Sequence, residues 1–226
     1  MKRSVRAAVL PVFFLLSLSA FATSGELLSF QGIGSLQQVG NFYNGGGFGD
    51  TPNYGVTFSS NFYGLRTPMG SFLPTPTGTP AIFICPGGLP QCSGTSPAAT
   101  TGIMNVANGF SSGINFFYAA GQTETVTLWS GANGTGTVLL TISLSANSCT
   151  SGGNTCMYNW SQLGKSFTGT AYSVTFSSSG PGDKFGLADI TLGSSSTAIP
   201  EPSSIYLLGT GLGVVSLAGL RRWLVA

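Results

Sequence analysis

Apolar and polar residues alternate with a period of two along most of the central chain, and a helical period is nearly absent. In Thr123–Trp129, Val126 and Leu128 fall on one face of an extended segment. Thr125 and Thr127 fall on the opposite face. This alternation is typical of an antiparallel sheet with one buried face. Short runs of this kind, separated by Gly, Asn, Ser and Pro, predict an all-β fold, an antiparallel jelly-roll-like β-sandwich.

Nine segments carry the strand pattern, each bounded by residues that favour turns. The predicted strands are Leu27–Gln31, Tyr54–Ser59, Ala81–Cys85, Gly102–Val106, Ile114–Ala119, Thr123–Trp129, Thr137–Leu144, Ala171–Ser177 and Lys184–Leu192. Asn133-Gly134 lies between two of them and is typical of the tight turn of a β-hairpin. We therefore expect Thr123–Trp129 and Thr137–Leu144 to be antiparallel neighbours.

The last predicted strand changes phase partway along its length. Phe185 and Leu187 share one parity, whereas Ile190 falls on the other. A shift of one residue turns side chains to the opposite face of a sheet, so we predict a β-bulge near Leu187–Asp189. Such a bulge would re-aim the side chain of Asp189.

Charged side chains are scarce, since Asp, Glu, Lys and Arg make up 6% of the sequence. Between residues 23 and 199, three basic residues face five acidic ones, which gives a net charge of −2. The basic footprint of a nucleic-acid-binding protein is absent there, and we expect no nucleic-acid partner. A surface made polar by Ser, Thr, Asn and Gly is typical of extracellular β proteins and of surfaces that meet neutral glycans.

The sequence has no histidine. This excludes histidine-based nucleophilic catalysis and histidine-ligated metals. A carboxylate pair, of which Asp183 and Asp189 are closest in sequence, is the remaining route to glycoside hydrolysis. Nothing places these two residues on a common face across the predicted bulge. We predict that the protein is not an enzyme, and a weak glycoside hydrolase is the least favoured alternative.

The four cysteines are arranged in two close pairs. Cys85 and Cys92 enclose six residues. Cys149 and Cys156 also enclose six. Four cysteines allow three pairings, and short loops close most easily, so we predict the two local disulfides. A zinc site is the alternative, but the spacing is unusual for zinc and an exported chain meets an oxidising compartment.

The N-terminal residues have the pattern of a secretory signal peptide. A basic segment, 1–6, precedes an apolar run, 7–21, and Ala20 and Ala22 form an A-x-A cleavage site. We predict that residues 1–22 pass through the secretion translocon and are removed by signal peptidase after Ala22. A first transmembrane anchor is the alternative, and the apolar run is short for one.

Three elements follow one another at the C-terminal end of the sequence. They are Pro200-Glu201-Pro202, the uncharged run 204–220 and the basic pair Arg221-Arg222. The two prolines hold the chain extended, so a helix can begin only after them. At 1.5 Å per residue the uncharged run spans roughly 25 Å, which predicts a single transmembrane helix with the arginines on the cytoplasmic side.

This order of elements resembles the PEP-CTERM sorting signal of Gram-negative bacteria. The resemblance implies recognition by an exosortase, a membrane transpeptidase-like enzyme, with cleavage near the Pro-Glu-Pro. It also implies association with an envelope that produces exopolysaccharide. Residues 200–226 would form the sorting signal, and a flexible linker, 194–199, would join it to an ectodomain spanning residues 23–193.

The ectodomain resembles the β-sandwich domains often attached to this signal. The resembling segments are Phe30–Gly34, Val39–Gly46, Asn53–Phe58 and Phe185–Leu192. Jelly-roll sandwiches of the carbohydrate-binding-module kind share this layout. Such sandwiches often hold a structural calcium, which here implies Gln31, Asp50 and Asp189 as candidate ligands. The alternative is that Asp189 only caps a bulge and that the protein has no cofactor.

Aromatic residues crowd the Gly- and Asn-rich stretch between residues 42 and 63. Tyr43, Tyr54 and Tyr63 are candidates for stacking on sugar rings, because ligand sites combine apolar faces with a few polar groups. The alternative is that many of these rings point into the sandwich, which is the usual fate of aromatic side chains.

The sequence as a whole predicts an exported protein of a Gram-negative bacterium. We expect an intermediate anchored in the inner membrane by the C-terminal helix, then a place at the cell surface or in the extracellular matrix. Its expected role is structural or adhesive within an exopolysaccharide layer. A carbohydrate-binding module is the first alternative.

Overall fold

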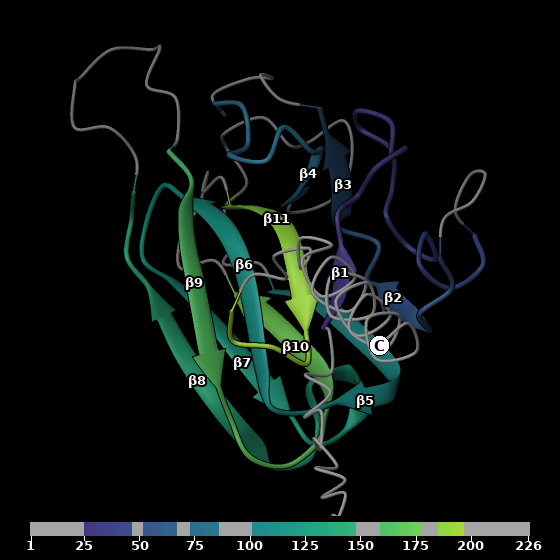
Figure 1. Cartoon of the computed structure of the whole chain (residues 1–226), viewed down its shortest axis with the longest axis vertical. Helices are drawn as coiled ribbons and strands as arrows, with labels where there is room; N and C mark the ends of the chain where they lie inside the picture. The colour runs from purple at the N-terminus through teal and green to yellow at the C-terminus, as the bar shows by residue number, and fades with distance from the viewer. Residues whose placement is uncertain are drawn as a thin grey trace, which may run out of the picture.

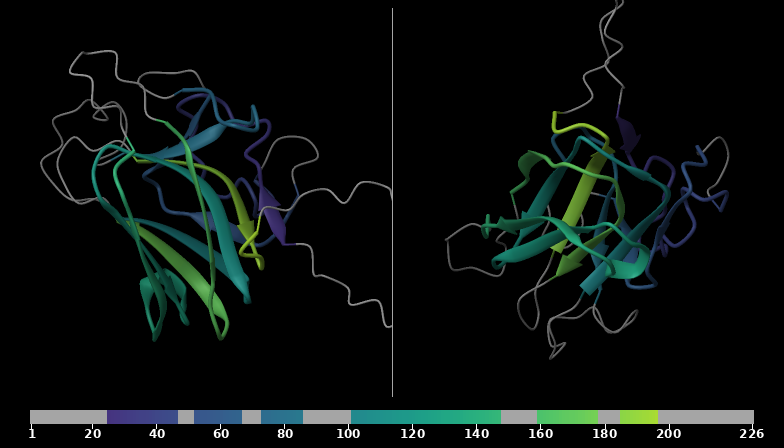
Figure 2. Two further views of the ribbon diagram at one scale, coloured as in Figure 1. Left: turned by 60° about the vertical axis from the view of Figure 1, so that its left-hand side comes forward. Right: turned by 90° about the horizontal axis from the view of Figure 1, so that it is seen from below.

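The computed structural model describes residues 25–46, 52–66, 73–85, 101–147, 159–177 and 185–196. Within these ranges the chain is all-β, apart from a three-residue 3-10 turn, η1 (Ala132–Gly134). The strands form two antiparallel sheets arranged as two layers (Figures 1 and 2). The predicted all-β antiparallel fold is therefore confirmed. No helix in the described ranges has the length and apolar character needed to cross a membrane.

The six-stranded sheet is built around β11 (Phe185–Leu192), which is buried along its whole length. Its order is β3-β4-β11-β6-β9, and β1 also pairs with β11. The other strands of this sheet are β1 (Glu26–Leu28), β3 (Phe62–Leu65), β4 (Ala81–Ile84), β6 (Gly113–Ala120) and β9 (Ser161–Ser166).

The five-stranded sheet has the order β2-β5-β10-β7-β8. Its strands are β2 (Val56–Phe58), β5 (Thr101–Phe110), β7 (Glu124–Trp129), β8 (Val138–Leu144) and β10 (Ala171–Ser177). The predicted hairpin is present, because β7 and β8 are antiparallel neighbours joined through η1. Asn133 and Gly134 both have positive φ, 58° and 68°, but the connection from Trp129 to Val138 is longer than the tight two-residue turn that the Asn-Gly pair predicted.

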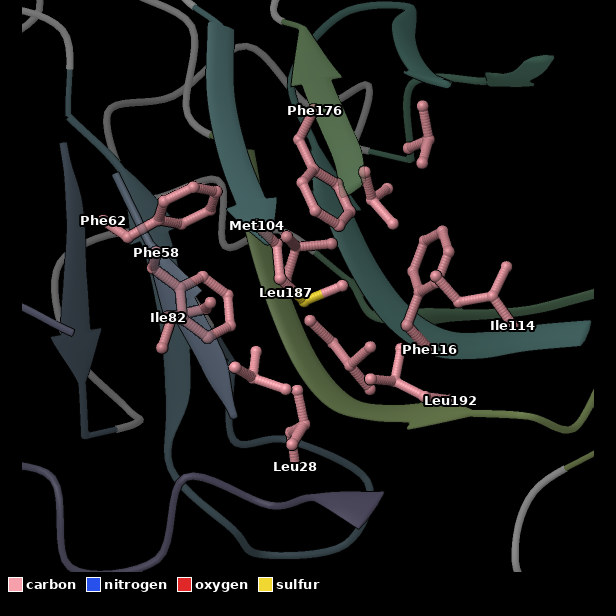
Figure 3. Close-up of a cluster of buried hydrophobic side chains, with 14 of the residues drawn as sticks. Leu28, Phe58, Phe62, Ile82, Met104, Ile114, Phe116, Phe176, Leu187 and Leu192 are labelled. Atoms are coloured by element: carbon pink, nitrogen blue, oxygen red, sulfur yellow. The ribbon is translucent and has the colours of Figure 1, made fainter. Parts of the chain in front are cut away.

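The inner faces of the two sheets share one hydrophobic core (Figure 3). Five of its largest side chains are fully buried phenylalanines that come from both sheets or from the segment after β1. They are Phe30, Phe62, Phe116, Phe176 and Phe185. Phe176 of the five-stranded sheet meets Phe62 and Phe116 of the six-stranded sheet edge-on, with ring centroids 6.0 and 6.3 Å apart. Edge-to-face ring pairs of this kind add to the burial of apolar area, so they hold the two layers together.

All nine predicted strands have counterparts in the structure, with ends that differ by a few residues. Two strands were not predicted, β3 and β9. β3 is four residues long and contains Gly64, whereas β9 reads Ser-Gln-Leu-Gly-Lys-Ser and is mostly exposed. Short, polar or glycine-containing strands at a sheet edge lack the alternation on which the prediction depended.

The packed structure continues beyond β11 into the segment predicted as linker. The Gly193 N–H donates to the carbonyl of Gly113, at 3.0 Å. The Asn115 side chain donates to the carbonyl of Ser195, at 3.4 Å. The chain therefore folds back across β6 and remains packed on the sheet through Ser195.

Candidate functional site

The outer face of the five-stranded sheet is a regular surface of mostly polar residues. Strand alternation produces it, since β7 buries Val126 and Leu128 and directs Thr125, Thr127 and Trp129 outward. The other four strands contribute outward residues of the same kind. We call this surface the polar face and define it by Thr57, Thr101, Ile103, Asn105, Thr125, Thr127, Trp129, Thr141, Ser143, Ser173, Thr175 and Ser177.

Strand register arranges these residues in three rows that run across the sheet. The rows are Thr57–Asn105–Ser173–Trp129, Ile103–Thr175–Thr127–Thr141 and Thr101–Ser177–Thr125–Ser143. Neighbours within a row lie on adjacent strands, about 4.7–4.9 Å apart, and successive rows are two residues apart along each strand. Apart from Ile103 and Trp129, the polar face is therefore a regular lattice of hydroxyl and amide groups.

No residue of the polar face carries a charge. The Trp129 ring is half-buried and its Nε1–H donates to Thr175 Oγ1 at 3.0 Å, which fixes the indole on the face. Thr101 Oγ1 and Ser177 Oγ lie 2.9 Å apart and are hydrogen-bonded. Since threonine is stiff at χ1, its hydroxyls are held in place before any ligand arrives. This arrangement suits a flat, uncharged ligand that is rich in hydroxyl groups.

The η1 turn covers the first of the three rows. Asn105 and Asn133 exchange two hydrogen bonds: the Asn105 amide donates at 2.9 Å and the Asn133 N–H donates to Asn105 Oδ1 at 2.7 Å. The Gly134 N–H donates to Ser173 Oγ at 2.9 Å. These bonds satisfy polar groups of the first row within the protein. In the second row Thr175 is buried, at 9% exposure, and its hydroxyl bonds to Trp129 and to the Thr127 carbonyl. The hydroxyls at exposed or half-buried positions in the second and third rows are those of Thr127, Thr141, Thr101, Ser177, Thr125 and Ser143.

The outer face of the six-stranded sheet has a different character. Leu65, Ala81, Ala119 and Ala188 form a small second apolar cluster there. Phe83, Phe117 and Trp160 are partly buried against this cluster. The Trp160 Nε1–H donates to the carbonyl of Leu73 at 2.8 Å, which fastens the segment before β4 to this face. Part of the outer face of the six-stranded sheet is therefore covered by another segment of the same chain.

Asp189 lies in a β-bulge, as its sequence context predicted. The register between β11 and β6 shifts between Ala188 and Thr191, and Asp189 has a φ of +48°. On the other side of β11, β4 pairs with Gly186 and Leu187 and β1 pairs with the part from Ile190 onward. Asp189 therefore occupies the junction at which β4 gives way to β1.

The Asp189 carboxylate accepts hydrogen bonds from two hydroxyls of the turn before β4. Thr79 Oγ1 donates at 2.9 Å, and Thr77 Oγ1 also donates. Burial raises the pKa of Asp189 above its ordinary value of 3.8, and the two hydroxyl donors act in the opposite direction. The bulge thus ties the Thr75–Thr79 turn to the last strand, which is a structural role.

Tyr43 is a core residue, and its predicted role as a sugar-stacking ring is wrong. It is 2% exposed, and its hydroxyl accepts the Phe30 N–H at 2.6 Å. Burial raises the pKa of Tyr43 to about 12. Tyr54 stacks on Tyr43 at a centroid distance of 5.9 Å, and Tyr63 packs against Phe83 at 6.1 Å. Both rings are half-buried, so the aromatic crowding in this stretch mainly builds the core.

The three candidate calcium ligands are not gathered into a site by the described residues. Gln31 lies exposed in a turn, Asp189 is bonded to two threonines, and Asp50 lies outside the described ranges. No cluster of three or more Asp, Glu, Cys or His side chains in the described ranges could hold a metal. Structural calcium therefore stays a prediction.

Of the four cysteines in the predicted disulfides, Cys85 lies within the described ranges. Cys85 is buried at the end of β4 and is disulfide-bonded, and no disulfide joins two of the described residues. Cys92, Cys149 and Cys156 lie outside the described ranges. Outside them also lie the signal cleavage site at Ala20 and Ala22 and the sorting elements Pro200-Glu201-Pro202 and Arg221-Arg222. The pairing of the cysteines and the processing of both ends stay predictions.

The polar face was not identified as a site from the sequence, although its signal was present. The outward parity of Thr123–Trp129, Thr137–Leu144 and Ala171–Ser177 is mostly Thr and Ser. Knowing that these three strands are neighbours in one sheet is what turns separate threonines into a lattice. That neighbour relation comes from the fold.

No family model and no curated protein matches this sequence. Among solved structures, the chain is similar to the K2 cleaved adhesin domain of Lys-gingipain, with 11% identity, coverage of 74% of this chain and 98% of that one, and a TM-score of 0.45. The chain is also similar to the K1 cleaved adhesin domain of Lys-gingipain from Porphyromonas gingivalis W83, with 15% identity, coverage of 76% of this chain and 100% of that one, and a TM-score of 0.44. For a family 6 carbohydrate-binding module the identity is 16%, the coverage is 76% of this chain and 95% of that one, and the TM-score is 0.36. These likenesses are too distant to carry an argument about this chain.

Proposed function

We propose that this chain is a non-catalytic, exported protein that binds a neutral polysaccharide through its polar face. One observation carries the proposal: six hydroxyl side chains at exposed or half-buried positions lie in two rows on a sheet surface that has no charge. Each hydroxyl can donate and accept hydrogen bonds, as sugar hydroxyls do. A neutral glycan loses no ionic hydration on such a surface, whereas an anionic polymer finds no cation there.

The rigidity of the face favours binding further. The rows lie on paired strands, and Trp129 is fixed by its bond to Thr175. Binding therefore orders few side chains, which keeps the entropic cost of association low. Tyr172, which lies in the register shift of β10 and is 38% exposed, is an additional ring beside the face for contact with a sugar.

We propose the cellular setting from the two ends of the sequence. The N-terminal pattern supports export, and the PEP-CTERM resemblance of residues 200–226 supports exosortase sorting to the cell surface or extracellular matrix. In this proposal the two layers are wound as a jelly roll and present the polar face to exopolysaccharide. The absence of histidine and the structural engagement of Asp189 support a role without catalysis.

Affinity electrophoresis of the full chain tests the ligand class. We expect retardation in gels that contain a neutral polysaccharide and none in gels that contain an anionic one. Because the polar face has no charge, the retardation should not change with salt concentration. Retardation by anionic polymers alone, or retardation abolished by salt, would contradict the proposal.

A further inference from the structure

The strand orders of the two sheets end at β2, β3, β8 and β9, and one segment closes two of these four edges. Residues 36–43 run first along β3, where the Val39 N–H donates to the Phe62 carbonyl at 3.0 Å. They then run along β2, where the Phe58 N–H donates to the Gly40 carbonyl at 2.9 Å. The backbone groups at these edges are therefore used within the chain, which prevents other strands from pairing there.

The remaining edges, β8 and β9, lie at the same side of the molecule (Figure 1). Within the described ranges neither has a strand neighbour on its outer side. β9 carries Gly164 and the charged Lys165, two features with which natural proteins protect an exposed edge. Ser195 also lies close above β9, since a Cβ added to Gly164 would meet its carbonyl.

β8 has none of this protection along most of its length. Its sequence, Val-Leu-Leu-Thr-Ile-Ser-Leu, contains no charge, no proline and no glycine. The register shift beside Trp129 affects only its first residues, and the part from Leu140 to Leu144 pairs regularly with β7. Uncharged segments of this kind, rich in β-branched and apolar residues, favour pairing with another strand.

We propose that β8 pairs antiparallel with β8 of a second copy of this chain. The two five-stranded sheets would then form one continuous sheet across a two-fold axis. In an antiparallel pair related by such an axis, each residue faces one of the same parity. Leu140 and Ile142, which point into the core, therefore meet inward residues of the second copy. Thr141 and Ser143, which are exposed, meet outward ones.

Several observations favour a second copy over another partner. The edge is self-complementary, because each copy offers the same outward N–H and C=O groups, which pair with no other described strand, and the same apolar inward residues. No charge on β8 repels its own copy. The pairing also places the two polar faces side by side on one sheet surface, which would raise the avidity for a long polymer. The pairing does not depend on the polar face being a glycan site.

Site-specific cross-linking of the full chain, exported by a Gram-negative host, tests the pairing. Thr141→Cys adds an exposed thiol on β8, and Ser166→Cys adds a matched exposed thiol on β9. After treatment with a short bismaleimide, we expect covalent dimers from Thr141→Cys and few from Ser166→Cys. Adding Ser143→Lys to Thr141→Cys should lower the dimer yield several-fold, because it brings two ammonium groups to the shared edge.

The outcomes separate the pairing from other kinds of association. Equal dimer yields from the two cysteine variants would show association through another part of the chain and would overturn the proposal. So would the absence of dimers from Thr141→Cys, or a yield unchanged by Ser143→Lys. A circular dichroism spectrum of Ser143→Lys that matches that of the unsubstituted chain shows that a loss of dimers is not a loss of fold.

Discussion

Asp189 holds a backbone conformation that few residues other than glycine, asparagine and aspartate adopt. Its φ of +48° directs the carboxylate out of the strand toward Thr77 and Thr79, more than a hundred positions earlier in the chain. The phase change of the apolar residues predicts the bulge, because it involves neighbours in sequence. The threonine partners could not be predicted, because only the fold brings that turn beside β11.

Asp189→Asn is expected to change how stability depends on pH. Burial raises the pKa of Asp189 above 3.8, so the folded state binds this proton more tightly than the unfolded state does. The contribution of the group to stability is therefore greatest at low pH and falls as pH rises through the range above 3.8. Asparagine tolerates positive φ and cannot titrate, so the variant lacks this decrease in stability with rising pH.

Urea unfolding of both proteins between pH 3 and pH 7 measures this effect, because the other titrating groups are shared. The unfolding free energy of Asp189→Asn, relative to the unsubstituted chain, should increase with pH. A difference that is constant, or that decreases, would mean that burial does not dominate the environment of this carboxylate.

At the scale of elements, the alternation of apolar and polar residues was sufficient for strands that bury one face. Glu124–Trp129 and Ala171–Ser177 were predicted nearly to the residue for that reason. β9 was missed because it is an edge strand whose side chains are mostly exposed, so no apolar face marks it. The order of strands within each sheet is not encoded in local alternation and required the structure.

The β7–β8 turn offers a test of an element that the sequence did predict. Gly134 has a φ of +68°, and an added Cβ would lie 2.9 Å from the Thr175 methyl group. Gly32 also has positive φ, +87°, but an added Cβ there meets nothing within 4 Å. We expect Gly32→Ala to cost about 1–2 kcal/mol from conformation alone, and Gly134→Ala to cost more because of the contact.

Thermal or urea unfolding of the two alanine variants gives the comparison. Equal losses would mean that the turn relaxes away from Thr175 without cost. A smaller loss for Gly134→Ala than for Gly32→Ala would contradict the close packing of η1 on the polar face.

At the scale of the whole molecule, we propose a chain with an export signal, a two-layer ectodomain and a sorting tail. The predictions for the two ends rest on short linear patterns of a kind that other proteins recognise. The proposed ligand surface could not be predicted, because it is assembled from strands far apart in the chain. Tyr43 illustrates the difference: its sequence neighbourhood resembled a ligand site, and its position in the fold makes it core.

The intact mass of the protein from the surface fraction of its native host tests the processing. We expect a species that begins at Thr23, ends close to Pro200 and is lighter by four hydrogens, as two disulfides require. Peptide mapping should pair Cys85 with Cys92 and Cys149 with Cys156. A full-length species confined to the inner membrane, or free thiols in the exported protein, would contradict this part of the account.

The most direct test of the central claim is the affinity of the Thr125→Val and Thr127→Val double variant for a neutral polysaccharide. Valine keeps the shape and strand preference of threonine and removes only the hydroxyls, so the fold should be retained. Losing two hydrogen bonds of roughly 0.5–1.5 kcal/mol each, about 1–3 kcal/mol in total, should weaken binding roughly 5- to 150-fold. Thr168→Val, an exposed position outside the polar face, should bind as the unsubstituted chain does. Unchanged affinity of the double variant, or an equal loss in Thr168→Val, would contradict the claim that the polar face is the binding surface.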